Sequence, residues 1–411
     1  MTKKLLFVYP NLQIGGIECW LMKQITNAVK NGYQVLWISN GYGRVFSGWS
    51  DFAANNIKKT NVFNILKELK KDDEIIGLCF RFVDYGYLLD LRKRLKGKSF
   101  NLFYCVPHFK DPVYFPEEFG FLSKLFIKYY KYVYETCDRL GNLLFFSSAH
   151  IESVQKRYGI VIKDRELKLI PVSGNLSSHG NFDVEMAQKR AVRNNFTIIT
   201  CGRFDFPHKG YMIGLIRIFA ELKEKYKDIK LIIIGYGPGK KQLETEVGKL
   251  NDETKRDIIF TGGVDPDRLI EYFNKSHLNI SVAGAVRAGA ITGLVSIPAR
   301  HYCYDCEVYG YLPDSIGYTT SEQPGIGAKE VIENVIKMSD ADYINLCKKS
   351  FFSFWSKESD DKFIFCKVNN YDSQSERKII SICRKVFLYQ ELNLFPKRIA
   401  GLFNFFRRQK C

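Results

Sequence analysis

The amino-acid sequence predicts an α/β protein built from two doubly wound domains. Short apolar runs alternate with longer segments of helical period along most of the 411 residues, which is typical of parallel strands connected by helices. A chain of this length exceeds what one hydrophobic core usually serves. The alternation is interrupted by a polar stretch that contains Gly174 and Gly180 and is typical of a linker. We therefore predict domains over 1–175 and 196–380, a linker over 176–195, and a basic, aromatic segment over 381–411.

The first series of elements starts at the beginning of the sequence. The apolar run "KLLFVYP" is predicted to be a strand, "IECWLMKQITNAVKNG" a helix that ends at Gly32, and "YQVLWIS" the next strand. Three more apolar runs are predicted to be buried strands of the same sheet: "EIIGLCFRF", "FNLFYCVP" and "LLFFSS".

The second series follows the linker. Strands are predicted at "FTIITCGRF", "IKLIIIGYG", "DIIFTGG" and "HLNI", with helices at "GYMIGLIRIFAELKEKY" and "KKQLETEVGKL". A further helix is predicted at "DPDRLIEYFNKS", with Asp265 as its N-cap and Pro266 at its first position. Doubly wound sheets bind ligands beyond the carboxyl ends of their strands, so the functional residues are expected in the loops there.

The charge balance points to an anionic partner. Lysine and arginine exceed aspartate and glutamate by 17, and the isoelectric point is near 9.2, which suits nucleic acid, an acidic membrane surface or a phosphorylated small molecule. A basic surface that serves solubility alone is the alternative. No nucleic-acid-binding motif accompanies the basic residues, so nucleic acid is disfavoured.

Neither the cysteines nor the first residues indicate a secreted protein. The eleven cysteines have no repeating spacing, which argues against a disulfide framework. Cys303 and Cys306 in "HYCYDC" admit a metal site with His301, a redox pair or ordinary free thiols, and a fourth zinc ligand is missing. No stretch reaches the roughly 20 apolar residues that cross a bilayer. The start is typical of a strand, not of a signal peptide, so a cytoplasmic protein is expected.

Two loops carry the pattern of an anion site. Gly15 and Gly16 lie between the first strand and its helix, where bare amides can approach an anion or simply make a tight turn. They do not form the fingerprint of a nicotinamide site. In "CGRFDFPHKGY", Arg203 follows a strand and Lys209 precedes a helix. A guanidinium and an ammonium in these positions suit a diphosphate; an exposed basic turn is the alternative.

Two further glycine-rich loops follow neighbouring strands of the second series. They hold Gly235 and Gly237 in "IIIGYGPGKKQL" and Gly263 with Val264 in "IIFTGGVDPDRL". Parallel strands end at the same edge of the sheet, so both loops are expected there. They either line a pocket for a flat base or only turn the chain.

These motifs together resemble a family-4 retaining glycosyltransferase of the GT-B fold, which has two Rossmann-like domains facing an interdomain cleft. The resemblance covers roughly residues 4–340 and is strongest over 197–281, from "GRFDFPHKG" to "HLNISV". It implies transfer of a sugar from a nucleotide diphosphate with retention, without a metal and without a cofactor, the nucleotide sugar being a substrate.

The resemblance also implies roles for individual residues. Arg203 and Lys209 would hold the diphosphate and act in catalysis, with Gly15 and Gly16 against it from the other domain. The loops with Gly235, Gly237, Gly263 and Val264 would surround the nucleoside. His108 in "FYCVPHFKDP" falls where the family often has a histidine near the reacting sugar; a structural histidine is the alternative.

The sequence departs from the family after the strand "HLNI". The family has two glutamates there, eight positions apart, whereas this chain has "SVAGAVRAGAITGLVS" and no carboxylate before Asp305 and Glu307. We expect Arg287 and the amides of Gly289, Ala290 and Thr292 to face the donor phosphate or sugar. Glu307 or a backbone carbonyl would replace the lost ribose contact. The alternative is that the small residues only allow helix packing and that Arg287 points to solvent.

The departure leaves two hypotheses for the activity. One is an active transferase with a reworked donor site, which the presence of both Arg203 and Lys209 favours. The other is a non-catalytic scaffold that binds a nucleotide or a partner protein.

Two aromatic and basic stretches suggest a membrane surface. Residues 117–140 mix Phe and Tyr with Lys124, Lys128 and Lys131, and residues 392–411 repeat this composition, which suits anionic headgroups. Core burial explains part of the aromatic residues. We therefore expect attachment to the inner face of the plasma membrane and a glycan or polyprenyl-linked acceptor, as in bacterial capsule or envelope polysaccharide synthesis.

Overall fold

The computed structural model consists of two compact α/β units. It describes residues 2–39, 43–70, 73–95, 99–107, 122–170, 181–192, 194–318, 321, 323–354 and 372–388. The first unit comprises residues 1–13, 24–171 and 363–411, and the second comprises residues 14–23 and 172–362. The predicted fold class, two doubly wound α/β domains, is confirmed by the two parallel sheets described next.

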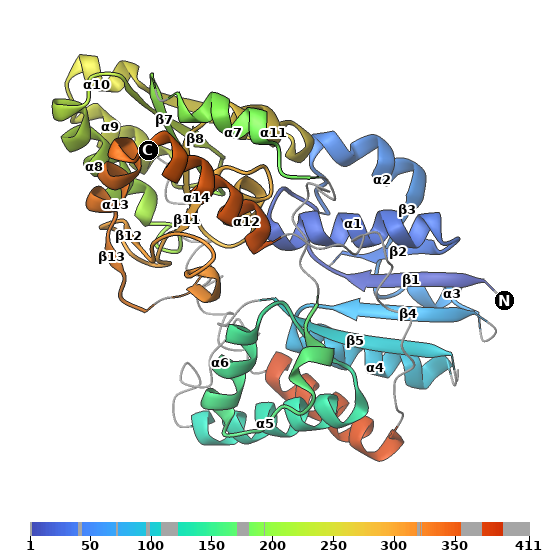
Figure 1. Cartoon of the computed structure of the whole chain (residues 1–411). Helices are drawn as coiled ribbons and strands as arrows, with labels where there is room; N and C mark the ends of the chain where they lie inside the picture. The colour runs from blue at the N-terminus through green and yellow to red at the C-terminus, as the bar shows by residue number, and fades with distance from the viewer. Residues whose placement is uncertain are drawn as a thin grey trace, which may run out of the picture. The chain divides into compact units, whose positions relative to one another are not determined.

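The first unit is built on a parallel sheet of six strands in the order β3-β2-β1-β4-β5-β6 (Figure 1). The strands that form it are β1 (Lys3–Val8), β2 (Gln34–Ile38), β3 (Ile57–Thr60), β4 (Glu74–Cys79), β5 (Phe100–Val106) and β6 (Leu143–Phe145). In β1, β2 and β4 every residue after the first is buried, as expected of a sheet that helices cover on both faces. Strand β3 is the exception, since its sequence IKKT is only half-buried at the edge.

Helices connect these strands. They are α1 (Gly16–Lys30), α2 (Ser50–Asn56), α3 (Ile65–Glu68), α4 (Phe82–Leu95), α5 (Ser123–Leu140) and α6 (Ser148–Tyr158), with 3₁₀ turns at η1 (Ser47–Trp49) and η3 (Arg165–Lys168). Helix α6 begins at an N-cap serine, Ser147, whose hydroxyl accepts from the amide of His150. Helix α5 ends at Gly141, whose φ of +72° closes the helix in the left-handed region.

A helix from the end of the described chain, over residues 373–388, completes the core of the first unit. Its apolar side chains, among them Ile379, Cys383 and Val386, are buried in the same cluster as α4 and α5. Gly86 of α4 allows the close approach, because a Cβ there would lie 2.3 Å from Cβ of Cys383. The predicted domain boundary at residue 380 falls inside this helix.

The second unit has a parallel sheet of five strands in the order β11-β10-β7-β8-β9. These are β7 (Phe196–Cys201), β8 (Ile229–Ile234), β9 (Ile258–Gly262), β10 (Leu278–Ser281) and β11 (Val295–Pro298). The helices and short elements around it are α7 (Val184–Ala191), α8 (Tyr211–Lys225), α9 (Lys240–Gly248), α10 (Asp252–Arg256), η4 (Pro266–Arg268), α11 (Leu269–Asn274), α12 (Gly284–Ala290), β12 (Glu307–Val308), η5 (Ile316–Tyr318), β13 (Ile326–Gly327), α13 (Ala328–Lys337) and α14 (Asp340–Ser353). Asp265 caps η4 and Pro266 occupies its first position, as predicted.

The predicted linker contains a helix of the second unit. Helix α7 begins after Asp183, whose carboxylate accepts from the amide of Met186, and it packs against α14. Arg190 of α7 is buried and donates to the carbonyl oxygen of Thr292 at 2.9 Å. The second half of the stretch predicted as linker is therefore part of a packed domain.

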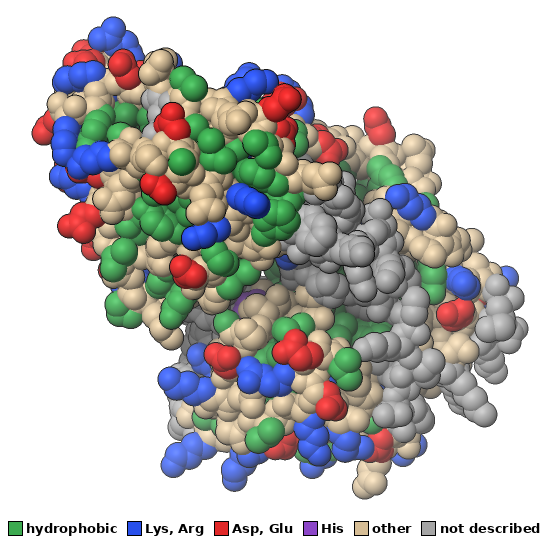
Figure 2. All heavy atoms as spheres, in the orientation of Figure 1, with side chains coloured by type: hydrophobic (Ala, Val, Ile, Leu, Met, Phe, Trp, Pro, Cys, Tyr) green, Lys and Arg blue, Asp and Glu red, His purple; other side chains and the backbone are tan. Residues whose placement is uncertain are grey.

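The surface and the helices bear on the membrane hypothesis. Among the described residues, none of the helices has the length and apolarity needed to cross a membrane. On the face drawn in Figure 2, lysine and arginine side chains are interspersed with aspartate and glutamate on both units. On this face the positive charge is distributed, so any basic binding surface has to be sought locally.

Candidate functional site

The loop between β7 and α8 brings two cationic side chains together. Arg203 is exposed and Lys209 is half-buried. The ammonium of Lys209 lies against Gly202, where a Cβ would come within 2.5 Å of Nζ. The amide of Lys209 donates to the carbonyl oxygen of Asp205 at 2.9 Å, which curls the loop back on itself. Glycine at 202 therefore leaves the space that the lysine side chain occupies.

The environment of Lys209 disfavours its positive charge. Burial, and after it the nearby charge of Arg203, lower the pKa of Lys209 to about 8. Two like charges held together while one is desolvated cost free energy. A bound anion would reverse this cost, because it would compensate both charges at once. Perturbed pKa values of this origin are typical of binding and catalytic sites.

Backbone hydrogen bonds join the loops after β7, β8 and β9. The amide of Phe204 donates to Tyr236 O at 2.8 Å, and the amide of Gly235 donates to Gly262 O at 2.9 Å. The amide of Gly239 donates back to Phe204 O at 2.9 Å. The pairing of the strands thus continues past the sheet edge and fixes the three loops relative to one another.

Gly235 and Gly237 are required by this close approach of backbones. A Cβ at Gly235, which has a φ of +153°, would lie 1.9 Å from Gly202 O, and one at Gly237 would lie 2.8 Å from Phe204 O. Loop packing therefore explains why these positions are glycine. Their contact with a nucleoside stays a prediction.

The third loop contributes Gly263 and Val264. A Cβ at Gly263 would lie 3.0 Å from the ring of Tyr236, so glycine leaves room for that ring. Val264 packs against the small buried cluster that includes Ile199 and Ile234. Both residues lie at the same sheet edge as Arg203 and Lys209, as predicted from strand order, and their nucleoside contact stays a prediction.

The segment after β10 contains small residues that pack on the sheet. Gly289 lies in the last turn of α12, where a Cβ would come within 2.5 Å of Nδ2 of Asn279 and 2.8 Å of Oγ of Ser296. Ala290 is completely buried, and the hydroxyl of Thr292 donates to Gly289 O at 2.7 Å. The small size of Gly289 and Ala290 therefore serves the packing of α12 on the sheet, and the contact of their amides with a donor stays a prediction.

Arg287 has an aromatic neighbour. Its guanidinium carbon lies 5.3 Å from the ring centroid of Phe354, at the end of α14, in the geometry of a cation–π contact. This contact accounts for a half-buried arginine on α12 without a phosphate. Its role at the donor is not supported by this position.

The carboxylate of Glu307 forms hydrogen bonds within the second unit. Both of its carboxylate oxygens accept from Nη1 of Arg300, at 3.0 and 2.9 Å, and Oε2 accepts from the amide of Gly325 at 2.7 Å. Burial alone raises the pKa of this carboxyl, but the Gly325 amide and Arg300 outweigh it and lower the pKa. The suggestion that Glu307 replaces the family's ribose contact therefore loses its basis.

The remaining predicted residues are placed as follows. Gly16 begins α1, and the position of its missing Cβ is open, which leaves room for a ligand; a Cβ at Gly15 would meet the carboxylate of Glu18. Their phosphate contact stays a prediction.

His108 lies outside the described residues. Cys303 and Cys306 are buried free thiols, and the described residues contain no cluster of three or more His, Cys, Asp or Glu that could hold a metal ion.

Sequence reasoning missed a histidine pair beside Lys209. Nδ1 of His301 lies 2.7 Å from Nε2 of His208, and 93 positions separate the two residues in the sequence. Each histidine stood out separately in the sequence, His208 directly before Lys209 in "PHKG" and His301 in "HYCYDC", but no local pattern connected them.

Comparison with known proteins identifies the segment that carries this site. The family described as Glycosyl transferases group 1 matches residues 181–284. Residues 181–284, the group 1 segment, therefore resemble the group 1 glycosyl transferases. The group 1 segment contains Arg203, Lys209, Gly235, Gly237, Gly263 and Val264, whereas Arg287 and the loop with His301 follow it.

A curated protein is also similar to part of the chain. Over 137 residues the chain is 31% identical to an uncharacterized glycosyltransferase of Methanocaldococcus jannaschii. The match covers 32% of each protein, so the chain spans about a third of that relative's length.

Two solved structures have a similar fold. HepE of Anabaena, in complex with UDP and glucose, is 10% identical with a TM-score of 0.56, covering 95% of this chain and 100% of that one. WaaG, a glycosyltransferase involved in lipopolysaccharide biosynthesis, is 16% identical with a TM-score of 0.53, covering 85% and 94%. Identities this low show the fold alone, and the fold is that of GT-B glycosyltransferases.

Proposed function

We propose that this chain is a glycosyltransferase that moves a sugar from a nucleotide diphosphate to an acceptor hydroxyl. The observation that carries the proposal is the pair of Arg203 and Lys209 at the carboxyl edge of a parallel sheet, where the pKa of Lys209 is lowered to about 8. The group 1 match over 181–284 supports it. Oε1 of Glu18 lies 3.9 Å from Nη1 of Arg203, and a diphosphate would add negative charge that both cations attract.

The proposed reaction needs neither a covalent nucleophile from the protein nor a metal ion. The bond between the anomeric carbon and the phosphate oxygen breaks, and its electron pair stays on the diphosphate. Arg203 and Lys209 stabilise the negative charge that develops there. The acceptor oxygen then bonds to the same face of the anomeric carbon, which retains its configuration, and the proton of the acceptor hydroxyl passes to the departing phosphate oxygen. His108 is proposed to lie near that carbon.

A panel of nucleotide sugars tests this proposal. UDP-sugars are the first to try, since a protein of similar fold was solved with UDP and glucose. A donor at 100 times its Kd is expected to stabilise the protein by about 2.7 kcal/mol, measured as a rise in melting temperature. With the acceptor, NMR is expected to show a product with the anomeric configuration of the donor, and EDTA is expected to leave the rate unchanged.

Other outcomes would decide against parts of the proposal. Stabilisation by no nucleotide sugar would contradict donor binding. An inverted product, or a rate that EDTA abolishes, would contradict the stereochemistry or the independence of metal. Stabilisation without turnover for any acceptor would favour the non-catalytic scaffold.

We further propose that the acceptor is lipid-linked and that the first unit attaches to an anionic membrane on the cytoplasmic side. Such an acceptor fits bacterial capsule or envelope polysaccharide synthesis. Three aromatic residues of α5 cannot contact a membrane surface, because Phe126, Tyr130 and Tyr134 are buried in the core. Tyr129 and Tyr132 remain half-buried beside lysines of the 373–388 helix, with Lys378 Nζ 3.9 Å from the Tyr132 ring centroid.

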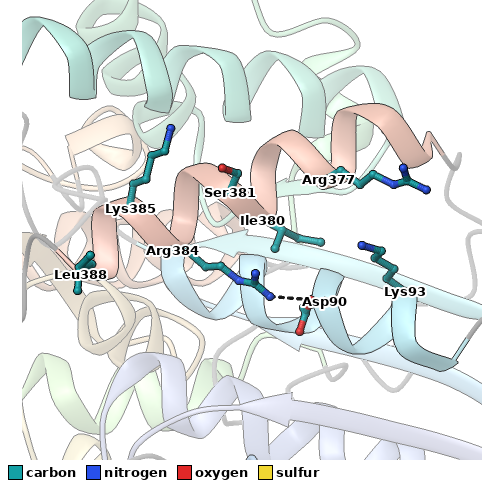
Figure 3. A pocket seen from close by; sticks show the side chains of 8 residues that line it. All are labelled: Asp90, Lys93, Arg377, Ile380, Ser381, Arg384, Lys385 and Leu388. Atoms are coloured by element: carbon teal, nitrogen blue, oxygen red, sulfur yellow. Dashed lines mark hydrogen bonds and ion pairs between the residues drawn. The ribbon is translucent and has the colours of Figure 1, made fainter.

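A basic groove on the same unit supports this attachment. It lies between α4 and the 373–388 helix, has a volume of about 310 Å³, and is shown in Figure 3. It is lined by Asp90, Lys93, Arg377, Ile380, Ser381, Arg384, Lys385 and Leu388. Asp90, the single carboxylate among them, bonds to Arg384 at 3.0 Å. Four cations against one paired carboxylate suit a phosphate-bearing headgroup, and Leu388 at its end is exposed.

Vesicle flotation tests the attachment. The chain is expected to float with phosphatidylglycerol vesicles and not with phosphatidylcholine vesicles. Replacing Lys93 and Arg377 by alanine is expected to weaken binding about 30-fold, since each juxtamembrane cation contributes about 1 kcal/mol. The matched control replaces Lys255 and Arg256 of α10, on the second unit. Equal binding to both lipids, or equal loss in the two double variants, would contradict the proposal.

A further inference from the structure

The loop between β11 and β12, over residues 301–306, is closed at its base. The amide of Arg300 donates to Glu307 O at 2.8 Å, and the guanidinium of Arg300 donates to both carboxylate oxygens of Glu307. The carbonyl oxygen of Ser321 accepts from the amide of His301 at 3.1 Å. His301 is 2% exposed. Its ring therefore starts from a fixed backbone and has little room to turn.

This loop packs on the residues that carry Lys209. Besides the bond between the His301 and His208 rings, the amide of Tyr302 donates to His208 O at 3.1 Å. His208 is thus held through both its side chain and its backbone, one residue before Lys209. Its neighbours Gly210 and Gly214 allow the approach, because a Cβ at Gly214 would lie 2.4 Å from Tyr304 O.

We propose that His301 is a positioning residue for Lys209, and that it acts through its hydrogen bond to His208. The inference rests on the proposed role of Lys209 in binding the donor diphosphate. The proposed role of His301 adds to the site a loop that lies outside the group 1 segment, because the family match ends at residue 284.

The chemistry of the pair limits how it works. Of the two facing nitrogens, one must carry the proton and the other must accept it. At least one ring is therefore neutral while the bond exists. A fixed His208 in turn keeps Lys209 folded against Gly202, where burial and Arg203 lower its pKa to about 8.

Calorimetric titration of UDP between pH 7 and pH 9.5 tests the role of His301. In the wild-type protein the affinity is expected to fall as the pH rises through about 8, because Lys209 loses the proton that attracts the phosphate. Arg203 disfavours this proton, while Cys201, Asp205 and Glu18 favour it. None of these four groups is changed in the variants.

His301→Ala is expected to free the loop, so that Lys209 becomes solvated. The midpoint of the pH dependence should then move up, toward the ordinary lysine pKa near 10.5. The affinity at pH 7.5 should fall about 10-fold, the cost of misplacing one charged donor, and KM for the donor should rise more than kcat falls. His301→Asn places an amide where Nδ1 was and is expected to keep the wild-type midpoint and affinity.

Controls separate positioning from stability. His277→Asn changes a histidine of the same unit whose Nδ1 accepts from the amide of Thr197 at 2.9 Å, and it is expected to leave the pH midpoint in place. Should His301→Ala not fold, His208→Ala removes the other half of the pair and is expected to give the same shift.

Three outcomes would overturn the inference. They are an unchanged midpoint and affinity in both alanine variants, an equal effect of His301→Asn and His301→Ala, and a midpoint shift in His277→Asn. A wild-type protein that binds no nucleoside diphosphate would instead overturn the proposed function, and this inference with it.

Discussion

Replacing Arg203 and Lys209 together by alanine is expected to abolish the binding of nucleoside diphosphates. Each side chain would make a charge-assisted hydrogen bond to the diphosphate, and such bonds contribute about 1.5–3 kcal/mol each. Their joint loss corresponds to a drop in affinity of roughly 100-fold to more than 10,000-fold. Isothermal titration with UDP, at a pH below 8 where Lys209 is charged, measures it.

The matched control removes the same number of charges elsewhere on the second unit. Lys255→Ala with Arg256→Ala in α10 is expected to keep the wild-type affinity, because both residues lie in the short helix before β9. Single replacements of Arg203 and Lys209 should each cost less than the double. An unchanged Kd in the double variant would contradict the assignment of the donor site.

Gly235→Ala is expected to destabilise the second unit strongly. The added Cβ would lie 1.9 Å from Gly202 O, and the φ of +153° is one that alanine rarely adopts. Overpacking costs about 1–3 kcal/mol, and backbone strain adds about 1–3 kcal/mol. A loss of about 3 kcal/mol corresponds to a fall in melting temperature of roughly 6–12 °C for a domain of this size.

Differential scanning calorimetry measures this effect. The transition of the second unit is the one that UDP shifts upward. Gly248→Ala is the control, since Gly248 ends α9 and has open space around the position of a Cβ; it is expected to be neutral or slightly stabilising. A Gly235→Ala protein that melts with the wild type would mean that the loops after β7 and β8 are not held together as described.

The sequence pattern was sufficient for the two sheets but not for all of their parts. Buried strands such as β1 and β2 contain continuous apolar runs, so their prediction needed only local information. Strand β3 was missed because its sequence IKKT lacks that run and is half-buried at the edge. Helix α7 had a signal, the cap at Asp183, but it lay in a polar stretch that is also typical of a linker.

The positions of candidate site residues were predictable from the sequence where the residues directly follow a strand. They were not predictable where they depend on a contact between distant parts of the chain. Arg203 and Lys209 stand beside a strand and a helix, so sheet topology alone places them at the ligand edge. Gly289 lies in a stretch of small residues that is also typical of an anion-binding loop. In the structure, however, glycine is needed there because the Asn279 side chain occupies the space of a Cβ. The His208–His301 bond joins residues 93 positions apart, a distance that no local pattern spans.

Because the 373–388 helix returns to the first unit, the core of that unit is completed last during synthesis. Ile379, Cys383 and Val386 belong to the same core as the strands of the first sheet, and they leave the ribosome after the entire second unit. The second unit can therefore close while the first still exposes the apolar faces of α4 and α5. A nascent chain stopped near residue 362 is expected to carry a folded second unit and an open first one, which makes that stage the one most exposed to aggregation and chaperone binding.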